Sequence, residues 1–294
     1  MTHINSAASA EPALSPCAGD ADIRILRRVS SLNDFPLAEP GDGPIRTVAV
    51  IDTETTGTDP DRDEIIDIAV VIVAVGAAGQ IVRIDRAGQA LRDPGMPIPA
   101  AITRLTGITE AHVRDKVIDL DALEALIASA DVRIAHNAAF DAAFIERLLP
   151  GLAGAAWACS ARDFDWVDRG FDGAKLGHLL MQIGHFNTGH RAMADVISLI
   201  HLLAHRLADG STVIGAILAN AERPTVRIEA AGAPFDKRSI LKGRGYRWDP
   251  AAKVWWIEIL DEDLESEALW LQREVTPWGP APRTRPLTWH ERHR

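Results

Sequence analysis

The sequence has little of several features that mark particular classes of protein. Its 294 residues include only two cysteines, Cys17 and Cys159, with no C-x-x-C pair, which indicates a reducing compartment and excludes a thiolate zinc site. No uncharged apolar run is long enough to span a bilayer, and the N-terminal region has neither a basic start nor a continuous apolar block. We therefore expect no signal peptide, no membrane contact and a cytoplasmic location.

Basic residues are outnumbered as well. The chain has 31 Lys and Arg against 41 Asp and Glu, a net charge of −10. This balance argues against a surface that coats itself with nucleic acid by bulk attraction, because phosphate affinity normally comes from Lys and Arg. It leaves open an enzyme that grips a few nucleotides locally. The apolar fraction of 47% supports a packed core, and the length suffices for one large domain and a small one.

Composition divides the chain into five parts. A partly flexible extension with one apolar-basic piece, "IRILRRV", precedes an α/β domain, a linker, a small tryptophan-rich module and a flexible, Pro-rich basic tail. Six of the eight tryptophans lie beyond residue 247. The predicted parts cover residues 1–45, 46–210, 211–224, 225–276 and 277–294.

Periodicity within the domain predicts strands first and then alternating helices and strands. The first two strands are almost uniformly apolar and are therefore expected to be buried on both faces. The order predicts an α/β layered domain with a mixed sheet flanked by helices. Strands are expected at 46–54, 65–75, 80–85, 132–137 and 157–159, and helices at 119–130, 141–149, 176–184 and 191–210.

The first predicted strand ends in two acids, Asp52 and Glu54, within "VAVIDTETTG". Alternate side chains of a strand point to the same face, so the two carboxylates are expected side by side with Thr53 opposite. Like charges at this spacing repel each other unless a cation lies between them, and hard oxygen ligands suit magnesium or manganese. The alternative for an isolated D-x-E is a solvated strand end.

Three further residues stand where chemistry is expected. Asp141 in "HNAAFD" follows a strand at a helix start, where an acid is also favourable on electrostatic grounds alone. Asp195 in "HRAMAD" lies in an otherwise apolar helical segment, which is costly unless the carboxylate is paired or metal-bound. His190 precedes that helix and is a residue type that exchanges protons near neutral pH, although a lone histidine is more often structural.

The motifs "IDTETTG", "HNAAFD" and "HRAMAD", with "ITRLTGIT" between the first two, resemble those of a known family. They match the DEDDh group of DnaQ-like 3′–5′ exonucleases, which includes the epsilon proofreading subunit of bacterial DNA polymerase III and RNase T. The resemblance covers the middle half of the chain. It implies an RNase H-like exonuclease fold with a mixed five-stranded sheet and the acids converging at one edge.

The resemblance also implies a role for each matching residue. Asp52 would be shared by two divalent cations, Mg²⁺ or Mn²⁺, with Glu54 and Asp195 completing the first site. Asp141 would hold the second cation, and His190 would be the general base. Two metals can serve both ends of an in-line displacement at phosphorus, so the physical requirements of phosphodiester hydrolysis agree with this assignment.

Five residues near these motifs are candidate substrate contacts. The family uses the backbone after the first strand to approach the terminal nucleotide, which implicates Thr55, Thr56 and Gly57, although the glycine can serve only the turn. Phe140 is a candidate stacking platform, with the core as its alternative. Asn137 is a candidate contact whose alternative is to orient the loop.

The C-terminal module interleaves basic and aromatic residues. Such a pattern is typical of single-strand binders, in which cations contact phosphates and rings stack on bases. We favour a core role for the tryptophans and nucleic-acid contact for the basic cluster. The W-D-P-x-x-K-x-W spacing resembles small DNA-binding modules of the HARP type. The candidate contacts are Lys237, Arg238, Lys242, Arg244 and Arg247.

These patterns favour a metal-dependent 3′–5′ exonuclease that acts on single-stranded ends, DNA more than RNA, and releases nucleoside monophosphates. Its partners would be nucleic-acid 3′ ends and, potentially, DNA polymerase or repair proteins. Because the module differs from the flexible tail of the epsilon subunit, a free-standing enzyme fits better than a dedicated proofreader. The alternatives are a non-catalytic nucleic-acid-binding or polymerase-associated protein with the same fold, and an RNA-trimming exoribonuclease.

Overall fold

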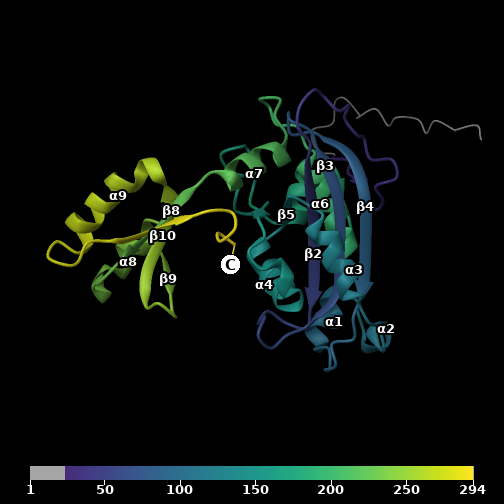
Figure 1. Ribbon diagram of the computed structural model, residues 1–294, viewed down its shortest axis with the longest axis horizontal. Helices are drawn as coiled ribbons and strands as arrows, with labels where there is room; N and C mark the ends of the chain where they lie inside the picture. The colour runs from purple at the N-terminus through teal and green to yellow at the C-terminus, as the bar shows by residue number, and fades with distance from the viewer. Residues whose placement is uncertain (1–23, 294) are drawn as a thin grey trace, which may run out of the picture.

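The computed structural model describes residues 24–293, which form a larger α/β unit and a smaller C-terminal module (Figure 1). The larger unit is built on a five-stranded mixed sheet, and the module on a four-stranded antiparallel sheet. Residues 1–23 of the predicted N-terminal extension lie outside the described part of the chain.

The sheet of the larger unit has the strand order β4-β3-β2-β5-β6. Its first three strands are antiparallel neighbours, and β5 and β6 run parallel to β2. Every residue of β3 is buried, as expected for an almost uniformly apolar strand covered on both faces. The predicted RNase H-like fold is confirmed. The strands are β2 (Arg46–Thr55), β3 (Ile65–Val75), β4 (Ile81–Leu91), β5 (Val132–Ala135) and β6 (Trp157–Cys159).

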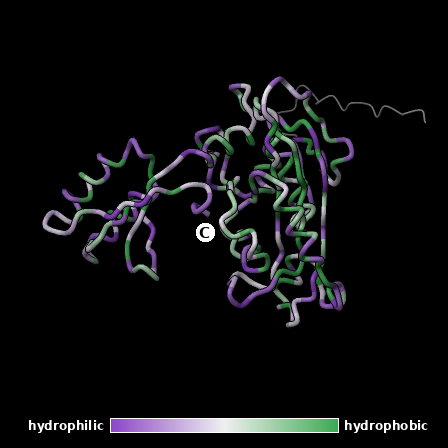
Figure 2. Tube along the Cα trace, viewed as in Figure 1, coloured by the Kyte–Doolittle hydropathy of each residue, from purple (hydrophilic) through white to green (hydrophobic). Residues whose placement is uncertain are grey.

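Helices cover both faces of this sheet (Figure 1). Alternate residues of β2 belong to different cores: Val48 and Val50 pack with α6 and α7, while Ala49 and Ile51 pack with α3 and α4. Figure 2 shows apolar residues concentrated along the central strands between these helices. The helices of this unit are α1 (Ala100–Thr106), α2 (Glu110–Val113), α3 (Leu120–Ala128), α4 (Ala138–Leu148), α5 (Leu176–Gln182), α6 (Ala192–Leu203) and α7 (Val213–Glu222).

Two boundary predictions are wrong in this unit. The last helix ends at Leu203 rather than at Gly210. The segment 211–224, predicted as a linker, contains α7, whose Val213 and Ile217 are fully buried in the core. Helix α7 can approach the β3–β4 turn closely because residue 79 of this turn is a glycine, which also suits its φ of +77°. A Cβ on Gly79 would lie 2.7 Å from the Cα of Gly215 in α7.

The described part of the N-terminal extension adds one short strand to the larger unit. This strand, β1 (Arg27–Arg28), pairs in parallel with β7 (His185–Phe186). Val29, which follows it, is buried against Leu180 and Ile197. The piece "IRILRRV" is therefore ordered in part, as predicted.

The C-terminal module packs its helices on one face of a sheet with the order β11-β8-β10-β9. Ile228 of β8, Leu241 of α8 and Leu271 after α9 form the centre of its core. The prediction that the tail is flexible is wrong, because residues 283–287 form the edge strand β11 and Arg292 and His293 form ion pairs. The elements are β8 (Thr225–Ala230), α8 (Arg238–Gly243), β9 (Arg247–Asp249), β10 (Val254–Leu260), α9 (Leu264–Trp270) and β11 (Arg283–Leu287).

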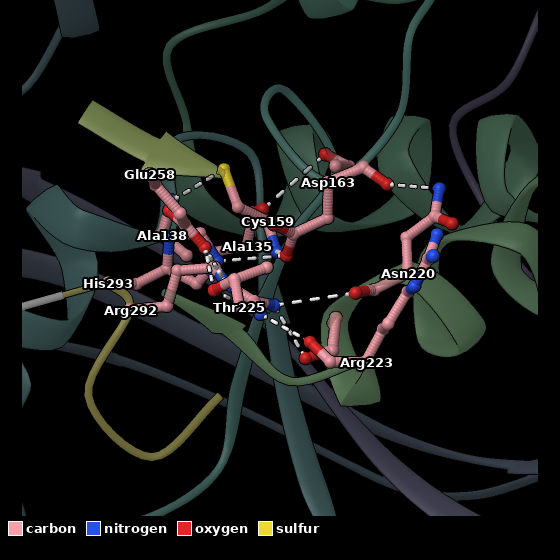
Figure 3. Close-up of polar contacts among 12 residues, drawn as sticks. Ala135, Ala138, Cys159, Asp163, Asn220, Arg223, Thr225, Glu258, Arg292 and His293 are labelled. Atoms are coloured by element: carbon pink, nitrogen blue, oxygen red, sulfur yellow. Dashed lines mark hydrogen bonds and ion pairs between the residues drawn. The ribbon is translucent and has the colours of Figure 1, made fainter. Parts of the chain in front are cut away.

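The last described residues connect the two units (Figure 3). The guanidinium of Arg292, 5% exposed, donates to Glu258 Oε1 of the module at 2.6 Å and to the carbonyl of Ala221 in α7 at 2.5 Å. His293 Nε2 lies 2.8 Å from Asp163 Oδ2 of the larger unit. Across residues 24–293, we find no helix with the length and apolarity that a membrane crossing requires.

Candidate active site

The acids of the three motifs meet at the carboxyl end of β2. Asp52 and Glu54 point to the α6 side of the sheet, because residues at even positions of β2 pack toward that core. Asp195 lies in the first turn of α6 and Asp141 in the first turn of α4. Thr53 points the other way, as predicted, and its hydroxyl donates to Asp141 Oδ1 at 2.8 Å.

The closest grouping of possible ligand atoms joins three of the predicted residues. One atom each from Glu54, His190 and Asp195 lie within 4.8 Å of one another. The backbone N–H of His190 donates to Asp195 Oδ2 at 2.7 Å, which fixes the loop before α6 to the carboxylate. Asp52 lines the same hollow as His190 and Asp195, while Asp141 is 3% exposed and is close enough for its charge to raise the pKa of Asp52.

The electrostatics of these acids are unfavourable without a cation. Burial and the charges of Asp141, Asp195 and Glu54 raise the pKa of Asp52 well above its usual range. Burial and the charge of Asp195 raise the pKa of Glu54 to about 8. Burial also raises the pKa of Asp141 and of Asp195. Four carboxylates in one poorly hydrated site disfavour ionisation, and a bound cation reverses that preference.

The donor set therefore fits a hard divalent cation. Carboxylate oxygens predominate, one imidazole is adjacent and no thiolate lines the described hollow, which suits Mg²⁺ or Mn²⁺ better than zinc. The residues available to hold such ions are Asp52, Glu54, Asp141 and Asp195.

Comparison with known proteins identifies the family. The model of the RNase T exonuclease family matches residues 49–203, which include all four acids and His190. The chain belongs to this exonuclease family. We refer to its larger unit as the exonuclease domain from here on.

Individual relatives agree with this membership. A DNA polymerase III subunit epsilon-like protein of Rhodobacter capsulatus is 34% identical over 188 residues, 58% of this chain and 26% of that protein. The PolC-type DNA polymerase III of Bacillus subtilis is 39% identical over 103 residues, 34% of this chain and 7% of that protein. The matches thus span about a quarter or less of the length of these relatives.

Solved structures with a related arrangement are also exonucleases. E. coli exonuclease I in complex with a dA16 oligonucleotide aligns at a TM-score of 0.45 and 17% identity, covering 83% of this chain and 64% of that one. Exonuclease X in complex with 5′-overhanging duplex DNA aligns at 0.38 and 23% identity, covering 57% and 98%.

A fifth acid of the exonuclease domain was missed by sequence reasoning. Asp67 in β3 lies opposite Glu54 in the sheet and is fully buried. It accepts hydrogen bonds from Gln89 Nε2 at 3.1 Å and from Arg191 Nε at 3.1 Å. The sequence feature that could have identified Asp67 is its position as the single acid within an otherwise apolar strand. Because Arg191 follows His190 directly, this ion pair ties the histidine's loop to β3.

Two residues of the site have left-handed backbone conformations. Asn137, between β5 and α4, has φ 84° and ψ 48°, and His190 has φ 64°. Asn and His adopt this region more readily than most residues, and it remains uncommon outside glycine. Such conformations persist where the surroundings hold them, and they cluster at functional sites.

The candidate substrate contacts of the exonuclease domain have different surroundings. The Thr55 hydroxyl donates to the Gly57 carbonyl, and the Thr56 hydroxyl donates to Asp63 Oδ1 at 3.1 Å, so both side chains stabilise the loop after β2. A Cβ on Gly57 would lie 2.3 Å from the Asp63 carboxylate, which explains the glycine by close packing.

The two candidates around α4 differ. Phe140 packs on Phe144 with ring centroids 4.9 Å apart, beside the α4 core, in agreement with its core alternative. Asn137 lines the same hollow as Asp52. That hollow measures about 900 Å³, and four further basic or imidazole side chains line it: His136, Arg162, Lys175 and His178. The short "AKLGH" at the start of α5 carries two of them but has no spacing that marks a site.

The five basic candidates of the module have different partners. Arg244 is a structural residue, since it donates to both oxygens of the buried Glu267, at 2.7 and 2.8 Å, and stacks over Trp270. Arg238 lies 4.0 Å over the exposed ring of Phe235. Lys242 is exposed on α8, and Lys237, which directly precedes α8, is half-buried. The fifth candidate, Arg247, faces the exonuclease domain.

The aromatic residues of the module divide between core and surface. Tyr246 is buried and donates its hydroxyl to Glu267 at 2.9 Å, and Trp255 and Trp270 pack against the module core. Trp248 is 48% exposed and pairs with Trp255. The core interpretation therefore holds for Trp255 and Trp270.

Proposed function

We propose that this protein is a metal-dependent 3′–5′ exonuclease that releases nucleoside 5′-monophosphates from the 3′ ends of single-stranded nucleic acid, DNA in preference to RNA. The observation that supports it most strongly is the convergence of four acids and His190 at one end of β2. Burial and the charges of neighbouring acids raise the pKa of Asp52 and of Glu54, which fits residues selected to hold cations rather than to remain ionised alone.

Each residue has a role in this proposal. Asp52, Glu54 and Asp195 would hold one cation, and Asp52 and Asp141 would hold a second. When bound, two Mg²⁺ or Mn²⁺ ions would supply charge neutralisation at the phosphate and acidification of a water. The hydrogen bond from the His190 backbone to Asp195 holds this histidine beside the hollow, where its imidazole accepts the proton of the attacking water.

Substrate contacts follow from the surroundings of the site. The loop of Thr55, Thr56 and Gly57 presents its backbone to the terminal nucleotide, because the threonine side chains are already used within the loop. Asn137 faces the same nucleotide from the hollow. The preference for DNA, and an association with polymerase or repair proteins, is supported by the epsilon-like and PolC-type names of the relatives and by the DNA in the complexes of exonucleases I and X.

The test is digestion of 3′-labelled and 5′-labelled single-stranded DNA and RNA with Mg²⁺, with Mn²⁺ and with chelator. Stepwise loss from the 3′ end should require metal, and Asp52→Ala should lower the rate at least about 100-fold, because metal sites lose 10- to 100-fold even through outer partners. The matched control is Asp121→Ala on the exposed side of α3.

Other outcomes reject parts of the proposal. Release from the 5′ end would reject the polarity, and activity in chelator would reject the metal dependence. Cleavage of RNA faster than DNA would favour the exoribonuclease alternative. Tight binding of every strand without cleavage would favour the alternative of a non-catalytic nucleic-acid-binding protein that retains the fold.

A further inference from the structure

A second hollow lies between the exonuclease domain and the C-terminal module. It has a volume of about 880 Å³. Arg162 and Asn220 line it on the exonuclease side, and Arg247, Trp256 and Glu258 line it on the module side. Figure 3 shows the polar contacts at this junction, where Asp163 and Asn220 lie near Thr225, Glu258 and the last residues of the chain.

This cleft adjoins the active-site hollow. Arg162 lines both hollows. At the start of α4, Asn137 lines the active-site hollow, and Ala139, two residues further on, lines the cleft. A strand that leaves the active site past Arg162 therefore enters the space between the two units.

Two arginines face this space from opposite sides without a carboxylate partner. Burial and the positive charge of Arg162 lower the pKa of Arg247, and the charge of Glu258, which forms its ion pair with Arg292, opposes this only in part. The two guanidinium groups thus act on each other as like charges. Among residues 24–293 neither side chain forms an ion pair. The neighbouring cations differ: Arg227 pairs with Asp249 at 2.8 Å, and Arg283 with Glu229 at 3.1 Å.

The acids of the cleft are distributed unevenly. Asp163 and Glu258 are engaged by the C-terminal residues His293 and Arg292. Asp165 and Asp263 line the cleft as well and would repel a phosphate backbone. An anionic strand is therefore attracted to the part of the cleft between the two unpaired arginines.

The module side of the cleft holds its arginine in place. The ring of Trp256 lies beneath two guanidinium groups, that of Arg247 at 4.2 Å and that of Arg227 at 4.3 Å from the ring centroid. This stacking limits the rotamers of Arg247, which reduces the entropy lost when it contacts a phosphate. The contacts of Arg292 and His293 hold the module against the exonuclease domain, so both walls are positioned before substrate arrives.

We propose that a single strand whose 3′ end occupies the active site continues into this cleft, where Arg162 and Arg247 contact its phosphates from opposite walls. The inference rests on the proposed exonuclease function and names the path of its substrate. A phosphate between the two guanidinium groups removes their repulsion and satisfies donors that no carboxylate of the described chain engages.

The experiment measures binding of fluorescently labelled DNA to the full chain in chelator, so that no hydrolysis occurs. Strands of about 3 and about 15 nucleotides are compared, since single-strand sites span roughly 4–16 nucleotides. The variants are Arg162→Ala, Arg247→Ala and the double variant. Arg283→Ala is the matched control. It removes an exposed arginine of the same sheet, and the charge of this arginine is already paired with Glu229.

Each cleft variant should weaken binding of the longer strand about fivefold, the upper range for an exposed charge pair. The affinity advantage of the longer strand over the shorter one should shrink accordingly in Arg247→Ala. The slope of log affinity against log salt should fall by about 0.7 for each phosphate contact removed. Arg283→Ala should change neither quantity.

Three results would overturn the path. They are an unchanged length advantage in Arg247→Ala, unchanged salt slopes in both single variants, or an equal loss in Arg283→Ala, which would indicate bulk charge. Hydrolysis of the wild-type protein with Mn²⁺ is measured separately. If the wild-type protein hydrolyses no strand while the cleft variants lose affinity as expected, the proposed function is wrong and the strand path stands.

Discussion

The crowding of acids at the end of β2 makes a quantitative prediction about the metal-free protein. Among the charges that act on Glu54, the carboxylate of Asp195 is the strongest, and burial acts in the same direction, raising the pKa of Glu54 to about 8 from 4.5. The Asp195→Asn substitution removes this charge, while the amide oxygen can still accept the hydrogen bond from the His190 backbone. The variant should therefore be more stable than the wild-type protein when no metal is bound.

The sign and size follow from proton binding. In the unfolded chain the Glu54 carboxyl is ionised above about pH 4.5, whereas in the folded protein it retains its proton to about pH 8. The folded state thus binds more protons across this interval, so stability falls as pH rises from about 4.5 to 8. At 1.36 kcal/mol per pH unit the limit is about 5 kcal/mol, which solvent screening of the partly buried Glu54 reduces to about 2 kcal/mol.

The assay is thermal unfolding in chelator at pH 5 and at pH 8. The wild-type midpoint should fall by about 4–8 °C over this interval, Asp195→Asn should recover about half of the loss, and Mg²⁺ should abolish the pH dependence of the wild-type protein. Asp85→Asn on β4 is the control, because hydrogen bonding by Arg83 lowers the pKa of that acid and its effect should be the same at both pH values. A flat wild-type profile, or no gain in Asp195→Asn at pH 8, would refute the reasoning.

Three further substitutions test other parts of the structure. Asp67→Asn should lower kcat about tenfold in steady-state assays, because it breaks the ion pair that positions Arg191 and the loop before α6. Arg292→Ala should destabilise the protein to urea by about 3 kcal/mol, because it leaves a partly buried carboxylate and several carbonyls unpaired. Gly79→Ala should lower the melting temperature more than Gly170→Ala, since both have positive φ but only the first meets the α7 backbone.

The part of the fold that sequence reasoning predicted well is the part in which local pattern and tertiary environment agree. The run Ile65–Val75 is apolar except for Asp67, and the structure buries all of it between two helical layers. Asp52 and Glu54 alternate along β2 as any strand requires, so their common direction could be inferred before the fold was known.

The elements that were missed depend on partners distant in sequence. The segment 211–224 is short and contains a glycine, which predicts a linker. It forms α7 instead, because its apolar residues pack on the sheet. The tail was considered unfolded because of its prolines, but β11 is an edge strand, and Pro286 can occupy a position there where no ladder donor is needed. Asp67 was not selected because its partner Arg191 lies 124 residues away.

An acidic protein can bind a polyanionic substrate if its few unpaired positive charges lie along the path of the strand. With a net charge of −10, the protein as a whole repels a polyanionic strand at long range, and salt screens that repulsion. Arginines that pair with carboxylates, such as Arg227 and Arg244, stabilise the module without adding to the field. In the proposed path, the two unpaired arginines of the cleft and the acids at the end of β2, with the cations they are proposed to hold, act only on a strand that has already entered. Affinity should consequently depend on strand length more than on the total charge of the protein.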